Sequence, residues 1–244
     1  MSGKGPVGEN EVLKVVVQQP QFLPWAGLWY KVLSADLYVL YCGVKFDQSD
    51  HQHRVTMNGS WLTLPIESGQ RNALIKDVKL AGGSLKKLAS TIRQNCMCKK
   101  FPYGDRLAGV VSILEGWPRI RMVDLNNALF EELIRVLGLK VALKYDWWDR
   151  SQQGLGKVEK LEACLQEHVG AERYMYLAGG GGLDYMGYDS LKGPVETRFQ
   201  KMHEDVSPDS VLQLIAKHDD PLSVIKGCAH WMTKQGGRRE WNER

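Results

Sequence analysis

The segment from Cys42 to Arg54 holds the densest group of side chains that could do acid–base or anion chemistry. Its sequence is CGVKFDQSDHQHR, and its titratable residues are Lys45, Asp47, Asp50, His51, His53 and Arg54. His51 and His53 are two positions apart, so on an extended segment their side chains would point the same way. Because imidazole titrates near neutral pH, the pair suits a general base, or two ligands of a metal site that lacks its third.

The same segment also has the composition of an anion site. Lys45 and Arg54 flank the histidines, and an Arg guanidinium binds phosphate or carboxylate bidentately. We therefore predict His53, His51 and Asp47 as catalytic residues, and Lys45 and Arg54 as substrate-binding residues. An incidental pair of surface histidines is the alternative interpretation.

Two further segments follow predicted strands, where open α/β sheets bind their ligands. The first, QQPQFLPW, supplies Gln18, Gln19, Pro20 and Trp25, and the second, AGGGGLDY, supplies Gly179, Gly180, Gly181 and Asp184. Glutamine amides donate and accept hydrogen bonds but are neither acids nor bases near neutral pH, so we expect them to position a substrate. A glycine run brings backbone N–H groups close to an anion, although a flexible turn also explains it.

Several other kinds of site are not indicated by the sequence. Cys96-Met97-Cys98 has the wrong spacing for zinc, so no metal is predicted. The chain has no Walker motif, dinucleotide fingerprint or G-x-S-x-G motif, and no cofactor is predicted. Trp147-Trp148, with Asp146 and Asp149 beside them, could stack on a base or sugar, or could belong to the core.

Hydrophobic patterning predicts alternating strands and helices along most of the chain. The strands are expected at 14–18, 37–42, 61–66, 75–80, 139–145 and 173–177, and in part of 199–206. The helices are expected at 25–34, 84–94, 104–115, 123–137, 157–169, 210–217 and 221–226. This order predicts an α/β fold with a mainly parallel sheet, helices on both faces, a Rossmann-like opening and a more irregular C-terminal part.

Composition divides the chain into three parts. Residues 1–13 are expected to be a flexible lead-in without a secretory signal, 14–206 the α/β core, and 207–244 a helical extension with a basic-aromatic tail. No apolar run reaches the roughly 18 residues of a membrane span. Five cysteines, an odd number, indicate a reduced, cytoplasmic protein rather than a disulfide scaffold. The net charge of +4 is mild, but its basic clusters could attract phosphates or nucleic acid.

Several stretches resemble the WbqC-like protein family. They are VVVQQPQFLPWAGLWYKVLSADLYVLY, VKF, HQHRV, WLTLPI, DLNNALFEELIRVLGLKVAL and YLAGGGGLDYM, spread over residues 15–206. The departures are informative. Gln18 stands where the family usually has His, and Cys42-Gly43-Val44 where many members have a paired acidic motif. His51 and His53 replace family asparagines, whereas Arg54 matches.

The resemblance implies a transferase. Bacterial members occur with surface-polysaccharide genes, and relatives in bacterial viruses resemble amino acid:DNA transferases of thymidine hypermodification. The leading expectation is therefore an enzyme of the host cytoplasm that joins glycine, as the free amino acid, to DNA carrying pyrophosphorylated 5-hydroxymethyluracil. The opening is also loosely similar to nucleotidyltransferases of the HUP class. The alternatives are transfer to a nucleotide-sugar or polysaccharide, and a non-catalytic DNA-binding protein. The sequence leaves the oligomeric state open.

Overall fold

One seven-stranded sheet organises the protein. The structure, a computed structural model, describes residues 12–82, 85–118, 120–150, 154–170 and 172–234, and the backbone of 238–239. Most of the expected lead-in and the end of the expected tail, including Trp241, lie outside these residues. The strands of the sheet, in spatial order, are β5 (Ala142–Asp146), β2 (Leu37–Tyr41), β1 (Leu13–Gln18), β6 (Tyr174–Ala178), β7 (Glu196–Met202), β8 (Ala229–Met232) and β9 (Arg238–Arg239).

Neighbouring strands from β5 to β7 are parallel, and β8 and β9 continue the sheet in antiparallel fashion. β1 lies between β2 and β6, with Val15 opposite Leu37 on one side and Tyr176 on the other. The sheet is thus mainly parallel, as predicted. β8 is a strand that the sequence analysis missed, because its short AHWM pattern follows a helix ending in Gly227 and resembles a loop.

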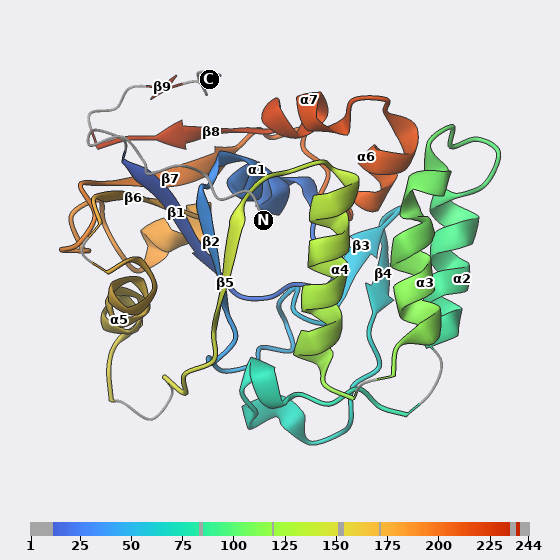
Figure 1. Cartoon of the computed structure of the whole chain (residues 1–244), viewed down its shortest axis with the longest axis horizontal. Coiled ribbons are helices and arrows are strands. Elements are labelled where there is room, and N and C mark those ends of the chain that lie inside the picture. Colours follow the sequence, from blue (N-terminus) through green and yellow to red (C-terminus); the bar gives the residue numbers. More distant parts are fainter. Residues whose placement is uncertain are drawn as a thin grey trace, which may run out of the picture.

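The helices cover both faces of the sheet, which confirms the predicted α/β architecture (Figure 1). α5 (Lys157–Val169) covers one face, and α1 (Ala26–Ser34) and α4 (Met122–Val136) cover the other. The remaining α-helices are α2 (Leu85–Cys96), α3 (Ala108–Gly116), α6 (Leu212–Lys217) and α7 (Pro221–Lys226). α3 packs against α4, and α7 packs against α1 and α6. No helix in the described part of the chain is long and apolar enough to cross a membrane.

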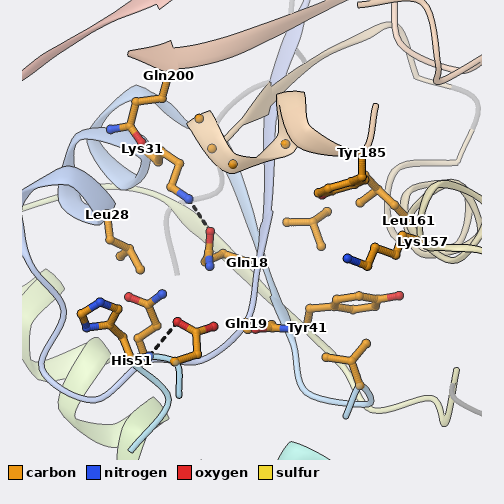
Figure 2. Close-up of a pocket in the computed structure, with 18 of the residues that line it drawn as sticks. Gln18, Gln19, Leu28, Lys31, Tyr41, His51, Lys157, Leu161, Tyr185 and Gln200 are labelled. Carbon is orange, nitrogen blue, oxygen red and sulfur yellow. Dashed lines mark hydrogen bonds between the residues drawn. The ribbon is translucent and has the colours of Figure 1, made fainter. Parts of the chain in front are cut away.

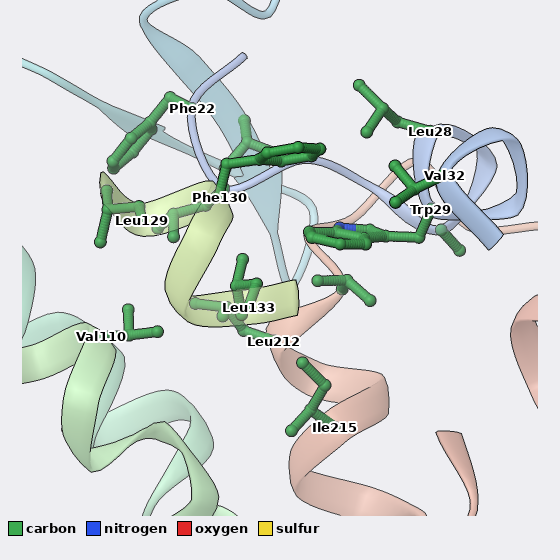
Figure 3. Close-up of a cluster of buried hydrophobic side chains, with 14 of the residues drawn as sticks. Phe22, Leu28, Trp29, Val32, Val110, Leu129, Phe130, Leu133, Leu212 and Ile215 are labelled. Carbon is green, nitrogen blue, oxygen red and sulfur yellow. The ribbon is translucent and has the colours of Figure 1, made fainter. Parts of the chain in front are cut away.

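Aromatic stacking anchors the larger half of the core. The Trp29 ring on α1 stacks on Phe130 of α4, with 5.0 Å between centroids, and Tyr38 of β2 lies 5.2 Å from the same Phe130 ring. Leu129 and Leu133 extend this contact along α4 (Figure 3). Burial of rings this large contributes much of a core's stabilisation. The opening helix is therefore held on the sheet by packing, which fixes where the loop before it lies.

A separate hairpin forms between β2 and α2. Its strands are β3 (Arg54–Met57) and β4 (Ser60–Thr63), joined by Asn58-Gly59 with both φ values positive, as an Asn-Gly hairpin turn requires. The strand expected at 75–80 is wrong. Residues Ile75–Asp77 form a 3₁₀ turn instead. Ile75 and Val78 are both buried and three residues apart, and a helix with three residues per turn sets such residues on one side.

A buried ion network joins the end of β5 to the C-terminal part of α5. The Asp146 carboxylate, fully buried, accepts two hydrogen bonds of 2.9 Å from the Arg150 guanidinium. Arg150 also pairs with Glu167 at 2.7 Å, and the His168 ring lies 3.3 Å from Asp146. A charge removed from water in this way is stable only while its partner stays in place. The pairing therefore fixes the position of the chain just after β5 relative to the C-terminal part of α5.

Asp146→Ala should lower the free energy of unfolding by about 3–5 kcal/mol, because it leaves the buried Arg150 guanidinium without its main partner. Urea denaturation followed by circular dichroism measures this. Glu115→Ala is the matched control, since it breaks the exposed Arg93–Glu115 pair and should leave stability nearly unchanged. Equal losses for the two variants would show that the Asp146 network is not a special support.

Candidate functional site

A cavity of about 730 Å³ opens at the carboxyl ends of β1, β2 and β6. β1 lies between the other two strands, and the chain leaves β1 toward β2 and returns to its other side as β6, which makes this a topological switch point of the sheet. The cavity is lined by Val17, Gln18, Gln19, Gln21, Trp25, Leu28, Lys31, Tyr41, Val44, Lys45, Asp50, His51, Lys157, Lys160, Leu161, Tyr176, Gly179–Gly182, Tyr185 and Gln200. Figure 2 shows these side chains converging from β1, α1, α5 and the glycine segment.

Lys31 is the most unusual of the lining residues. It lies on α1, is only 6% exposed, and directs its ammonium into the cavity, where Nζ donates to Gln18 Oε1 (Figure 2). No carboxylate among the described residues forms an ion pair with it. Burial lowers the pKa of Lys31 to about 8, with the charge of Asp50 acting weakly in the opposite direction. A buried cation held by a neutral amide is an incomplete anion site.

The glutamines at the end of β1 are held by further amides. Gln18 is the last residue of β1, and its Oε1 is taken by Lys31. The next side chain, Gln19, accepts a 2.8 Å hydrogen bond from Gln52 Nε2. Both line the cavity with their polar ends fixed. This geometry suits the predicted positioning role, which stays a prediction.

The glycine segment forms the wall opposite α1. Gly180–Asp184 is a single 3₁₀ helix that follows Gly179. A Cβ on Gly180 would lie 2.9 Å from the Gln200 backbone oxygen, and one on Gly179 would lie 3.3 Å from Lys31 Nζ. Gly180 therefore allows a close approach of backbone to backbone, and the Cβ-free Gly179 leaves room beside the Lys31 ammonium. Asp184 ends this 3₁₀ helix and is not among the cavity-lining residues.

The two histidines diverge. Residues 51–53 form turns rather than an extended segment, so the condition for parallel side chains is not met. His51 lines the cavity, and among the described residues the buried Nδ1 atoms of both His51 and His53 have no hydrogen-bond partner. His53 is 6% exposed and packs edge-on against Phe46, and burial lowers its pKa, with Arg54 adding to the effect. The structure thus brings His51, but not His53, to the cavity.

Some of the remaining predicted residues line the cavity and others do not. Lys45 and Trp25 line the cavity, whereas Pro20 does not. Arg54 stacks on Trp61, 4.3 Å from the ring centroid, and donates to the Ser49 carbonyl at 2.7 Å.

Asp47 lies in an exposed turn beside a shallower hollow, where it accepts hydrogen bonds from the backbone and hydroxyl of Ser49. These bonds lower the pKa of its carboxyl. The roles assigned to Asp47, His53 and Arg54 stay predictions.

Sequence reasoning missed much of the cavity wall. The missed residues are Lys31, Tyr41, Lys157, Lys160, Tyr176, Tyr185 and Gln200. Lys31 had a readable signal, because a lysine within the apolar run of a buried helix needs an explanation. Tyr185 lies in the glycine segment that the sequence had already singled out. The others come from segments that are ordinary in sequence and meet only when the sheet forms.

The lining is positively charged as a whole. Its lysines are Lys31, Lys45, Lys157 and Lys160, against Asp50 as its carboxylate. Excess cations on partly apolar walls favour a substrate with several negative charges. Such a cavity can bind carboxylate and phosphate groups together, and His51 supplies an imidazole beside them.

A group of possible metal ligands lies away from this cavity. Asp146, Cys164 and His168 offer ligand atoms within 4.8 Å of one another, and no other such group occurs among the described residues. Arg150, however, already binds both oxygens of Asp146, and burial raises the pKa of the Cys164 thiol. A neutral thiol next to a guanidinium opposes a cation, so we interpret the group as part of the ion network.

The chain matches one protein-family model, that of the WbqC-like protein family, over residues 19–208. The match includes the opening loop, α1, the 51–54 segment and the glycine segment. No curated protein and no solved structure matches the chain.

Lys31→Met should change how stability depends on pH. With its pKa lowered to about 8 in the folded state, Lys31 binds fewer protons there than in the unfolded chain, so wild-type stability should rise with pH above about 8. Relative to Lys31→Met, the wild-type protein should gain about 2 kcal/mol between pH 7 and pH 9.5, measured by urea unfolding.

The exposed Lys140→Met variant is the control and should follow the wild type across this range. A Lys31→Met difference that stays flat with pH would mean that the Lys31 charge is hydrated.

Proposed function

Because the chain belongs to the WbqC-like protein family, we propose that it is a transferase whose cavity joins an amino acid to a pyrophosphate-activated acceptor. The acceptor is pyrophosphorylated 5-hydroxymethyluracil in phage DNA, and the amino acid is glycine. Pyrophosphate is the second product. The observation that supports this proposal is the buried Lys31 ammonium, which shares the cavity with three other lysines and has no ion pair with a carboxylate in the part of the chain that the structure describes.

A buried, unpaired cation disfavours the empty site and favours one filled by an anion. The desolvation that lowers the pKa of Lys31 is relieved when a carboxylate or phosphate comes into contact with it. Each substrate in the proposed reaction brings an anion, the carboxylate of the amino acid and the pyrophosphate of the acceptor. Lys31, beside the close-packed Gly179, suits the carboxylate of a small amino acid.

The chemistry is a displacement at carbon. The amino-acid nitrogen attacks the 5-methylene carbon of the base, a C–N bond forms, and the C–O bond to pyrophosphate breaks with its electron pair leaving on oxygen. Lys45, which also lines the cavity, stabilises that developing charge. The imidazole of His51, which lines the cavity, accepts the proton that the ammonium nitrogen must lose. Departure of pyrophosphate drives the reaction, so it needs no further co-reactant.

Side chains beside the cavity support DNA as the acceptor. Trp147 and Trp148 follow β5 and are 39% and 61% exposed. The Arg121 guanidinium lies 5.8 Å from the Trp147 ring. The Trp148 backbone also packs closely on Gly43. A Cβ added to Gly43 would lie 1.6 Å from the Trp148 carbonyl oxygen, so the tryptophan pair lies against the segment that leads to Lys45. Exposed indoles with neighbouring cations are suited to nucleic-acid strands.

Incubating the protein with DNA that contains pyrophosphorylated 5-hydroxymethyluracil, together with glycine, should yield a glycyl-modified nucleoside and one pyrophosphate per product. Nucleoside digestion with mass spectrometry and a pyrophosphate assay measure the two. DNA with unphosphorylated 5-hydroxymethyluracil is the control and should stay unchanged. The proposal fails if none of the common amino acids is transferred. Transfer to a nucleotide-sugar alone would favour the polysaccharide alternative.

His51→Ala should affect mainly turnover, and His53→Ala mainly stability. Loss of His51 should reduce turnover by about 10²–10⁴-fold with little loss of stability, because a general base contributes on that scale. Loss of His53 should lower the melting temperature, because its ring is buried against Phe46, and leave the turnover of the folded protein within about threefold. The reverse pattern would return the base role to His53.

A further inference from the structure

Two tyrosines, Tyr41 and Tyr185, line the part of the cavity away from Lys31 (Figure 2). Tyr41 is the last residue of β2, and Tyr185 follows the 3₁₀ helix of the glycine segment. In Figure 2 their rings are seen nearly edge-on, one on each side of the Lys157 ammonium. Leu161 of α5 and Tyr176 of β6 are almost fully buried and close the back of this space.

Local contacts hold the two rings apart. The Tyr41 hydroxyl donates to the Lys160 carbonyl at 3.3 Å, which anchors that ring to α5. Burial raises the pKa of the Tyr41 phenol, and the charges of several neighbours, Tyr185 among them, contribute. No ring–ring contact joins Tyr41 to Tyr185 among the described residues, and both line the same cavity. Two aromatic faces separated by a gap suit a flat guest that stacks on both.

Lysines lie at the mouth of this gap. Lys157 Nζ lies 5.3 Å from the centroid of the Tyr185 ring, so its ammonium now contacts the aromatic face that a guest would use. Lys160, three residues further along α5, also lines the cavity. An ammonium over a ring is weakly held at an exposed site, and an anion attached to the guest would draw it away from the ring.

We propose that the gap between Tyr41 and Tyr185 binds the pyrimidine ring of a nucleotide, with its phosphate groups on Lys157 and Lys160. This inference rests on the proposed function, because it states where the acceptor base lies. The pyrimidine ring stacks between the phenol rings of Tyr41 and Tyr185. Its 5-methylene group points toward Lys31 and His51, where the amino acid binds. A pyrimidine in this position has left the stack of its own helix.

The positive charges of Lys157 and Lys160 favour a nucleotide over other flat ligands. An aromatic amino acid would offer one ring and one carboxylate and would leave an ammonium of its own among lysines. A nucleotide offers a ring and phosphate without a cation. Electrostatic complementarity with Lys157 and Lys160 therefore favours the nucleotide.

Isothermal titration of the wild-type protein with thymidine 5′-monophosphate and with deoxyribose 5-phosphate tests the subsite, since only the first has a ring. The nucleotide should bind about tenfold more tightly or better, as expected for stacking of one base. Tyr185→Ala should abolish this preference and Tyr185→Phe should retain it. Lys157→Met should weaken both ligands to a similar extent.

Tyr103→Ala is the matched control, since Tyr103 is a half-buried ring remote from the cavity and stacked under Arg106. It should leave both affinities unchanged. Equal affinity for the two ligands, no binding of either, a Tyr185→Ala variant that keeps the preference, or tighter binding of phenylalanine than of the nucleotide would each overturn the subsite. Ring preference without amino-acid transfer would leave the subsite standing and reject the transfer, and transfer without ring preference would do the opposite.

Discussion

The parallel pairing of β1 with β2 and β6 is the constraint on which the rest of the structure depends. It brings the ends of these three strands to one edge of the sheet, and the segments that follow them have to diverge around a common space. The glutamines after β1, Tyr41 and Lys45 after β2, and the glycines after β6 all enter the cavity for this reason. Backbone hydrogen bonding thus assembles the site before any side chain contributes to it.

Lys31 shows how stability and function compete at this edge. Its helix is fixed to the sheet by the stacking of Trp29 on Phe130, and Lys31 is only 6% exposed there. The resulting desolvation weakens the folded state, and the same desolvation strengthens attraction for an anion. An apolar residue would make a more stable protein with a less effective cavity.

Much of this arrangement is readable in the sequence, and the limits have physical causes. β-branched runs and helical periodicity predict β1, β2, α4 and α5 closely, because those elements bury regular faces. The 75–80 segment was misread because its apolar residues fit both a strand and a 3₁₀ turn. The three segments predicted at strand ends all contribute to the lining of one cavity. Tyr41 and Lys157 join them there only through tertiary packing. Spacing along the chain also could not show that His51 lines the cavity whereas His53 packs against Phe46.

The cysteines set the redox character of the molecule. All five thiols are free, and Cys42, Cys96, Cys164 and Cys228 are buried, which raises the pKa of each. Cys42 follows β2 directly, at the edge of the sheet where a nucleophile would be expected, yet its Sγ turns back to the Leu40 carbonyl at 3.4 Å. Oxidants and alkylating agents react with thiolates, so the four buried thiols are unreactive toward them. Cys98, partly exposed, is the thiol through which oxidative damage would enter the fold.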